Sequence, residues 1–531
     1  MGTDIPYYIS FRHNHAAYRQ SPAAALRVNQ VTSETIIMKM GKLFIVLVSL
    51  GLAGKQRVKA QTFTTLYNFS NNGNGMDPQA GLILSTNKLY GTTFAGGVNG
   101  YGSVFAINTN GNCLTNVYSF IAPNTTNSSG NNPISELVLC KSRLYGTAEF
   151  GGSYNAGTVF AVNIDGSDFT NFHSFSTISN HTNIDGAFPQ AGLLLASNIL
   201  YGTTYGGGTH GSGTIFSINT DGTDFTNLHN FISSSDGANP YAGLIICSNT
   251  LYGTAYDGVT NGQGTVFSMS TDGTNFTIIY TFTTPHYGIN NDGANPYAGL
   301  TISGNTLYGT AWGGGNFGSG TVFAVNTDGT GFTNLHSFSA VSSAIYPGPN
   351  NSQNAYFNTD GLEPEGSLTL SGNTLYGTTF NGGSGGSGTV FSVKTNGMNF
   401  TNLYEFKATT NYTNNDGANP QSQLLFTDNT LYGTAFQGGG SGYGTIYSVS
   451  VQPAPLIVGI NLSGAGLVIN GANGRSGGTC YALMSTNLSL PFSQWISVAT
   501  NTLNTSGSFT ITVTNTVDAT VPQRFYILQM Q

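Results

Sequence analysis

The sequence is poor in charge and in cysteine. Only 7% of its 531 residues are Asp, Glu, Lys or Arg, against about 25% in a typical domain. Aromatic residues nevertheless reach 12%, so the chain can bury a large apolar area, which argues against disorder. Four cysteines are too few for a disulfide framework, and we expect them to be small buried hydrophobic side chains.

Basic residues are especially rare outside the N-terminus. Eight of the 15 Lys and Arg residues lie in the first 60 positions, which leaves seven basic against 20 acidic residues in the remainder. Such a chain cannot neutralise a phosphate backbone, so the composition excludes nucleic acid as a partner.

The N-terminal region has the build of a secretory signal. A short basic segment, Met38–Lys42, precedes an apolar run, Leu43–Ala53, and a small-residue site before Gln61. This order predicts a signal peptide over 38–60, because the apolar run is short for a membrane span. Residues 1–37 are then an unstructured extension or follow a start codon assigned too far upstream. The alternative is an N-terminal membrane anchor. We expect a secreted or cell-surface protein whose mature chain has no membrane span.

Glycine, abundant at 73 residues, belongs to a repeat. Leu-Tyr-Gly-Thr occurs seven times, and five of the six spacings are 51 to 56 residues. Each copy holds four strand signals separated by turn residues, which we name a to d; in one copy they cover 191–195, 199–205, 214–218 and 225–231. Strand c is apolar on both faces, as in a sheet packed between two others. The pattern predicts an all-β protein.

The count of strands predicts how the array closes. A d-type motif, Phe63–Phe69, precedes the first strand a, and the last copy ends at its c strand, Thr445–Val449. The leading motif is expected to pair beside that strand and leave no open edge. The sequence therefore predicts a seven-bladed β-propeller over 61–451, closed by an N-terminal strand.

The repeat resembles a known family. The a–b–c–d order with a Leu-Tyr strand running into glycines resembles the kelch repeat, although Phe replaces the usual outer-strand Trp. The repeat itself is similar to the GloVer (Gloeo/Verruco) tandem repeat of exported bacterial proteins over 62–451. The resemblance implies bacterial export and a surface or extracellular role, and it implies no established activity.

The pattern changes after Val451. Pro453 and Pro455 mark a linker, and 452–531 holds five strand-like runs with turn signals between them, as in a small β-sandwich-like domain. The runs are Leu456–Leu462, Gly466–Ile469, Cys480–Met484, Ser508–Val513 and Arg524–Leu528. The domain resembles a C-terminal module of exported bacterial proteins, which implies attachment or sorting.

Candidate ligand-binding residues lie on the face that carries the d–a and b–c loops, because variable loops on a rigid scaffold usually carry function. The largest insertion, 340–365, lies in the sixth copy and supplies aromatic and acidic side chains. Strand b also ends in an aromatic residue in six copies; we interpret these mainly as inter-blade core, with Trp312 as the exception. The candidates are Trp312, Tyr346, Tyr356, Phe357, Asp360, Glu363 and Glu365. The alternative is a solvated loop without a ligand.

No catalytic or metal constellation is predicted. Glycine patterns such as Gly206-x-Gly208-x-x-Gly211 join two strands, whereas a dinucleotide site needs a strand and a helix. His173, His229 and His336 lie in different blades, too far apart to share a metal. The Asp-Gly pairs before strand a are explained as turns, with a calcium ring as the alternative. We expect no cofactor.

These features favour a non-catalytic, exported binding or adhesion propeller that recognises a carbohydrate or another surface polymer, with an extracellular polysaccharide or a surface protein as partner. One alternative is a polysaccharide-acting glycosidase or lyase that uses Asp360, Glu363 and Glu365, because such enzymes need paired carboxyl groups. Another is a purely structural cell-surface spacer.

Overall fold

The chain divides into two compact units, residues 60–451 and residues 1–59 together with 452–531. We call them the repeat unit and the terminal unit. The computed structural model describes residues 36–40, 44–51, 62–71, 73–121, 129–259, 262–346, 353–451, 456–463, 466–473, 479–487, 490, 494–504, 507–514 and 525–530. Most of the predicted extension 1–37, the end of the predicted signal peptide and the Pro453–Pro455 linker lie outside these residues. In the described part of the chain no helix is long and apolar enough to cross a membrane.

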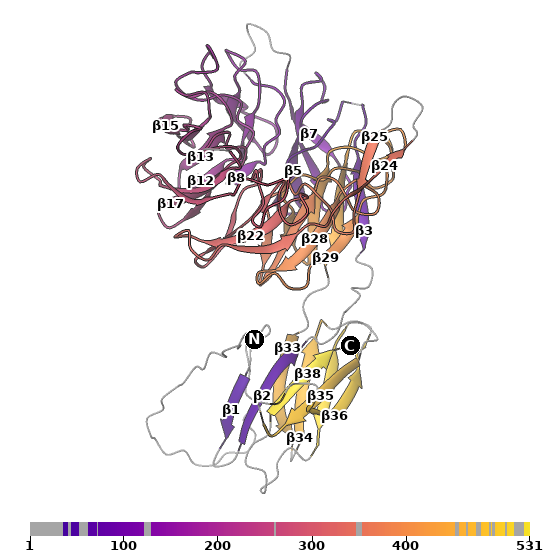
Figure 1. The fold of residues 1–531 in the computed structure, drawn as a ribbon. Helices are drawn as coiled ribbons and strands as arrows, with labels where there is room; N and C mark the ends of the chain where they lie inside the picture. The colour runs from indigo at the N-terminus through magenta and orange to yellow at the C-terminus, as the bar shows by residue number, and fades with distance from the viewer. Residues whose placement is uncertain are drawn as a thin grey trace. The chain divides into compact units, whose positions relative to one another are not determined.

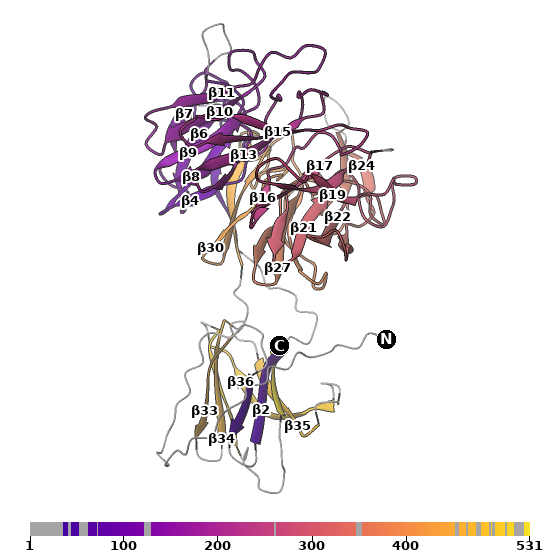
Figure 2. The same cartoon turned by 90° about the vertical axis from the view of Figure 1, so that its left-hand side faces the viewer.

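The repeat unit is built of four-stranded antiparallel sheets (Figures 1 and 2), and its described residues contain seven of them. The a strands are β4 (Ile83–Ser85), β8 (Val138–Cys140), β12 (Leu194–Ala196), β16 (Ile245–Cys247), β20 (Thr301–Ser303), β26 (Thr369–Ser371) and β30 (Leu425–Thr427). The b strands are β5 (Lys88–Thr93), β9 (Arg143–Ala148), β13 (Ile199–Thr204), β17 (Thr250–Ala255), β21 (Thr306–Ala311), β27 (Thr374–Thr379) and β31 (Thr430–Ala435). The c strands are β6 (Ser103–Asn108), β10 (Thr158–Asn163), β14 (Thr214–Asn219), β18 (Thr265–Ser270), β22 (Thr321–Asn326), β28 (Thr389–Lys394) and β32 (Thr445–Ser450). The d strands are β7 (Thr115–Ser119), β11 (Thr170–Ser174), β15 (Thr226–Asn230), β19 (Thr277–Thr281), β23 (Thr333–Ser337), β29 (Thr401–Glu405) and β3 (Phe63–Asn68).

The N-terminal and C-terminal ends of the repeat meet in one sheet. β3 pairs antiparallel with β32, with Phe63 opposite Val449 and Asn68 opposite Thr445. This is the pairing that the displaced d motif predicts. The insertion of the sixth copy forms a separate hairpin of β24 (Ser342–Tyr346) and β25 (Gln353–Phe357).

A buried threonine of each b strand ties its sheet to the next. Its hydroxyl donates to a carbonyl just before the following strand a, for example Thr147 to Ala191 at 3.1 Å, and the last bond runs from Thr434 back to Ala80 at 2.9 Å. The other five donors are Thr92, Thr203, Thr254, Thr310 and Thr378. The Ala191 carbonyl bonds to the preceding sheet in this way, and the a strand of that copy begins at Leu194, three residues later than the sequence predicts.

The Leu-Tyr-Gly-Thr motif is explained by packing inside each sheet. The leucine is fully buried, and the glycine lies over the aromatic ring of the neighbouring c strand. A Cβ atom on Gly202 would lie 2.4 Å from Cζ of Phe216. Only glycine fits there, so each copy keeps it.

An aromatic ladder connects consecutive d strands. His173 stacks on Phe225 of the next sheet at 3.6 Å between ring centroids, and Tyr404 stacks on Phe63 at 3.7 Å, across the junction of the two chain ends. The same histidine or tyrosine contacts an Asp-Gly aspartate, as His173 does with Asp185 at 2.9 Å. The histidines that sequence analysis rejected as metal ligands are therefore part of this packing.

The terminal unit has two sheets. β33 (Leu456–Ser463), β34 (Gly466–Ala472) and β37 (Phe509–Val513) form one; β35 (Thr479–Ser485), β36 (Ile496–Thr502) and β38 (Phe525–Met530) form the other, together with β1 (Ile36–Met40) and β2 (Phe44–Gly51). Both sheets contribute to one buried cluster that includes Ile469, Cys480 and Leu528. β2 pairs in parallel with β38, so the segment predicted as a signal peptide contributes strands here.

The prediction of four buried cysteines is wrong in part. All four are free: Cys480 is buried, Cys140 and Cys247 are half-buried, and Cys113 is exposed. Cys113 has a positive φ of 58° in the c–d turn, where no sheet can cover it.

Candidate functional site

The repeat unit contains a pocket of about 520 Å³, within the size range of small-molecule sites, about 300–1,000 Å³. The segments that lead into the a strands line it, and every sheet contributes. Each segment follows a proline and presents its first and third residues. The first residues are Gln79, Ile134, Gln190, Tyr241, Tyr297, Glu365 and Gln421; the third are Gly81, Glu136, Gly192, Gly243, Gly299, Ser367 and Gln423.

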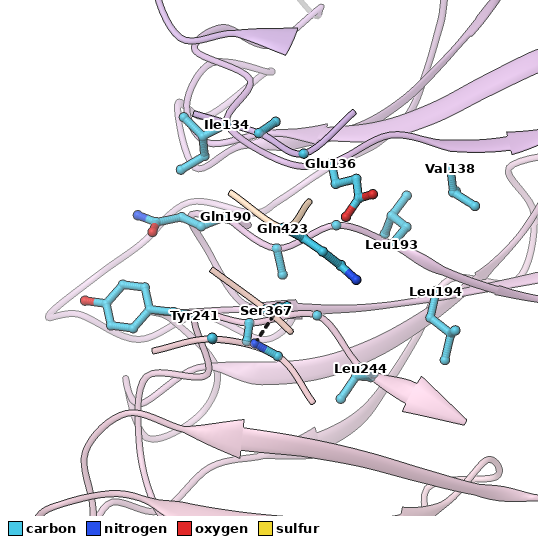
Figure 3. A pocket seen from close by; sticks show the side chains of 18 of the residues that line it. Ile134, Glu136, Val138, Gln190, Leu193, Leu194, Tyr241, Leu244, Ser367 and Gln423 are labelled. Carbon is cyan, nitrogen blue, oxygen red and sulfur yellow. Dashed lines mark hydrogen bonds between the residues drawn. The ribbon is translucent and has the colours of Figure 1, made fainter. Parts of the chain in front are cut away.

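The two levels are visible in Figure 3. Tyr241 and Gln190 lie toward one end of the pocket, and the Glu136 side chain lies deeper, near Gln423. Four of the third positions are glycine, and the absence of a side chain there keeps the inside of the pocket open. A Cβ atom on Gly81 would lie 3.1 Å from Cδ of Glu136, so the glycine makes space for that carboxyl group.

One side of the pocket is a row of tyrosines. Tyr241 stacks on Tyr297 with 4.9 Å between centroids and on Tyr205 with 5.1 Å. Tyr256 meets Tyr241 edge to face at 5.4 Å. Burial raises the pKa of Tyr241 to about 12, so these side chains are neutral phenols. Tyr241 and Tyr297 line the pocket, so the row offers apolar ring surface together with hydroxyl groups.

Carboxyl groups lie beside the tyrosines. Burial, together with the charge of Glu363, raises the pKa of Glu365 to about 8, and the Trp312 side chain acts in the opposite direction. Burial likewise raises the pKa of Glu136 to about 7. None of the residues that line the pocket is Lys, Arg or His. The pocket thus holds acidic groups without a basic partner among its lining residues.

Amide side chains complete the lining. Gln190 donates to Oε1 of Glu149 at 2.8 Å, and Gln421 donates to Gln79 at 2.9 Å. The remaining amide atoms, together with those of Gln423, can donate to and accept from hydroxyl groups.

One predicted site residue, Glu365, lines this pocket. Trp312 lies close enough to lower the pKa of Glu365. Glu363, half-buried, accepts from Asn381 at 2.6 Å and raises the pKa of Glu365. These three are brought together by the structure.

The other predicted residues are not brought to the pocket. Asp360 accepts from His336 at 2.9 Å and from the backbone N–H of Ser339 at 3.0 Å, so it fixes the start of the hairpin. Tyr356 is 40% exposed on the β24–β25 hairpin, and Phe357 is half-buried there. Tyr346 lies in β24, and its side chain lies outside the described residues.

Sequence analysis interprets the aromatic residues after strand b mainly as inter-blade core, with Trp312 as the exception. None of them is buried; all are half-buried, and Tyr205 and Tyr256 belong to the tyrosine row. Tyr205 and Tyr256 follow the last paired residue of strand b, and each contacts a tyrosine that leads into the next sheet. The residues concerned are Phe94, Tyr205, Tyr256, Trp312, Phe380 and Phe436.

Sequence analysis missed most of the pocket. The signal that could have found it is the residue after each proline, which differs between copies that are otherwise nearly identical. It is Tyr at 241 and 297, Gln at 79, 190 and 421, Ile at 134 and Glu at 365.

No metal site emerges from the described residues, where no three His, Cys, Asp or Glu side chains lie close enough to hold an ion. The Asp-Gly aspartates bond to the protein itself. Tyr280 donates to Asp292 at 2.8 Å, and the N–H of Thr283 donates to the same oxygen at 2.9 Å.

The fold and pocket define an all-β repeat protein with propeller-like four-stranded sheets around a shared pocket. The model of the Gloeobacter/Verrucomicrobia repeat matches residues 51–184 and 175–357. The chain belongs to this family. No curated protein matches it.

Solved structures with a similar arrangement share little sequence. An oligogalacturonate lyase in complex with manganese has 10% identity and a TM-score of 0.40, over 74% of this chain and 96% of its own. A putative 6-phosphogluconolactonase from Bacteroides uniformis has 16% identity and a TM-score of 0.38, over 69% and 97%. TolB from Acinetobacter baumannii has 12% identity and a TM-score of 0.33, over 58% and 60%.

Proposed function

We propose that residues 61–451 form a seven-bladed β-propeller closed by β3, that 452–531 is a small β-sandwich-like domain, and that the protein is an exported, non-catalytic binding or adhesion protein for a carbohydrate or another surface polymer. The closing hydrogen bond from Thr434 to Ala80 and the β3–β32 pairing support the closed ring. The shared core of Ile469 and Leu528 supports the sandwich.

The observation that carries the binding function is the composition of the pocket. Tyrosine faces stacked at 4.9 Å and 5.1 Å stand beside amide groups that can pair with hydroxyls. Sugars present apolar C–H faces and many hydroxyls, which suits such a lining. The repeats depart from one another at the lining positions, where a scaffold alone would keep one residue.

A glycan array on the full chain, with reducing ends measured in parallel, tests this proposal. Tyr241→Ala and Tyr297→Ala should each weaken binding about tenfold or more, because a stacked aromatic contact is lost. The matched control is Tyr154→Ala, since Tyr154 is 57% exposed and does not line the pocket. Equal loss in all three variants, or no glycan bound by the parent protein, would refute the proposal and favour a structural spacer.

A second candidate function rests on the paired acids Glu363 and Glu365. The pKa of Glu365, raised to about 8 by burial and by the Glu363 charge, gives a protonated acid beside a carboxylate, as glycosidases require. Asp360 is held by His336 and drops out of this set. Release of reducing ends that Glu363→Gln and Glu365→Gln both abolish would establish the enzyme; binding without release would exclude it for the glycans tested.

Export through residues 38–60 belongs to the same proposal. Because β2 pairs with β38, removal of the signal would leave that edge of the sheet open. The intact mass of the exported protein decides: a chain that begins near Gln61 supports cleavage, and a chain that retains Phe44 refutes it.

A further inference from the structure

We propose that the pocket selects a ligand with a charged amine, and specifically a polymer of amino sugars whose amines are free. This inference rests on the proposed function and names the substrate class of the same pocket. It starts from the carboxyl groups, which accept hydrogen bonds from any sugar hydroxyl but find a positive charge only in a cationic ligand.

The first step is charge. Glu136 and Glu365 line the pocket, while Lys, Arg and His are absent from its lining. Among the described residues, the Glu136 carboxyl group has no hydrogen-bond partner, and it points into the pocket (Figure 3). A carboxyl group enclosed without a cation is costly unless it is protonated or a ligand supplies the charge. When these carboxyl groups are ionised, an acidic polysaccharide would add repulsion, which disfavours uronate polymers as ligands.

The second step is the kind of cation. A divalent metal needs several ligands at one point, and the described residues hold no cluster of three such groups. An ammonium group needs only a carboxylate and an electron-rich ring face. Tyr297, which lines the pocket, is the tyrosine next to Glu365: the Glu365 charge raises the pKa of Tyr297, after burial the largest effect on that phenol.

The third step is the rest of the ligand. The tyrosine row extends beyond one ring, from Tyr205 through Tyr241 to Tyr297, and the amides of Gln79, Gln421 and Gln423 suit hydroxyl groups. A sugar that carries an amine combines an apolar face, hydroxyls and a cation. A free amine fits these carboxyl groups, whereas an N-acetylated one carries no charge.

Titration calorimetry on the full chain at about pH 6, where amines are charged, tests the inference. The probes are tetramers of glucosamine, N-acetylglucosamine and glucose joined by one linkage, with tetralysine as a charge control. We expect the glucosamine tetramer to bind about tenfold tighter than the two uncharged sugars. It should also release protons on binding, measured in two buffers of different ionisation heat, because the ammonium lowers the pKa values of Glu136 and Glu365.

Three variants locate the effect. Glu136→Gln and Glu365→Gln keep the shape of the side chain and should each reduce the amine preference and the proton release. Asp328→Asn removes the same charge from an exposed turn and should leave both unchanged. The inference is overturned if the tighter binding of the glucosamine tetramer persists in both Gln variants. It is also overturned if Asp328→Asn reduces that preference as much as the Gln variants do.

The sugar arms separate the two levels of the proposal. If the uncharged tetramers bind as tightly as the amine tetramer, the inference fails and the carbohydrate function stands. If tetralysine binds as tightly, charge alone explains the result and the amino-sugar inference fails. If no tetramer binds the parent protein, both fail.

Discussion

Replacing Tyr447 by phenylalanine should stabilise the protein. Tyr447 is fully buried in β32, and its hydroxyl has no hydrogen-bond partner among the described residues. The equivalent c-strand residue in each of the other sheets is phenylalanine. In the sheet of Tyr447, a Cβ atom on Gly433 would lie 2.5 Å from the tyrosine oxygen, so the backbone of the facing b strand encloses the hydroxyl group. A buried polar group without a partner costs about 1–3 kcal/mol, and Tyr447→Phe should recover that amount.

Urea unfolding monitored by fluorescence measures it. The midpoint should rise at unchanged slope, because the surface exposed on unfolding is the same. The reciprocal variant, Phe391→Tyr, adds a hydroxyl at the equivalent fully buried position of β28 and should lower the midpoint by a similar free energy. An unchanged or lower midpoint in Tyr447→Phe would show that the hydroxyl is satisfied, for instance by an enclosed water, and would refute the reasoning.

Three further predictions concern stability. Burial and the Glu363 charge raise the pKa of Glu365 from 4.5 to about 8, so between these pH values the folded state keeps a proton that the unfolded state loses. The free energy of unfolding should therefore fall as pH rises from about 4.5 to about 8. Urea titrations at successive pH values measure this fall, and Glu365→Gln should remove it. Phe69→Ala, directly after the closing strand β3, should cost about 3–5 kcal/mol, as much as Phe231→Ala directly after β15, since both side chains are fully buried. A much smaller cost would mean that β3 is dispensable. Glu363→Asn should raise the free energy of unfolding by about 1 kcal/mol. Asn tolerates the φ of 58° at this position, and its amide donates to the backbone carbonyl after strand b in other copies, as Asn295 does to Tyr256. The same variant should weaken ligand binding in the calorimetric assay.

The sheets could be predicted because the sequence repeats. Seven copies of Leu-Tyr-Gly-Thr average out the ambiguity of any one strand, and the displaced motif at Phe63–Phe69 predicts the pairing with β32 that the structure contains. In the terminal unit each strand occurs once. Its β36, with an Ala-Thr-Asn-Thr ending and mostly exposed side chains, carries no apolar alternation and escaped prediction.

The pocket could not be predicted by the same reasoning. Residues such as Tyr241 and Gln190 follow Pro in a segment that reads as the start of an ordinary strand, and nothing in the local pattern indicates that the segments of all sheets converge. The sequence instead directs attention to the longest insertion. Part of that insertion forms the β24–β25 hairpin, and its end brings Glu365 to the pocket with Glu363 nearby.

The residue before each pocket proline shares one backbone conformation in all copies but differs in type. The residue before each pocket proline has a positive φ of 56–59° in every copy, a conformation that Asn adopts more readily than most residues. Four copies use Asn, and each Asn side chain donates to the carbonyl that ends the preceding strand b, as Asn239 does to Tyr205 at 2.8 Å. The remaining copies have Asp77, Phe188 and Glu363. Phe188 stacks on Tyr205 at 5.6 Å, and Glu363 acts on Glu365, so two of these departures place strained residues against the tyrosine row and the acidic pair. Both departures accept backbone strain at positions beside the tyrosine row and Glu365, which supports the proposed binding role of the pocket.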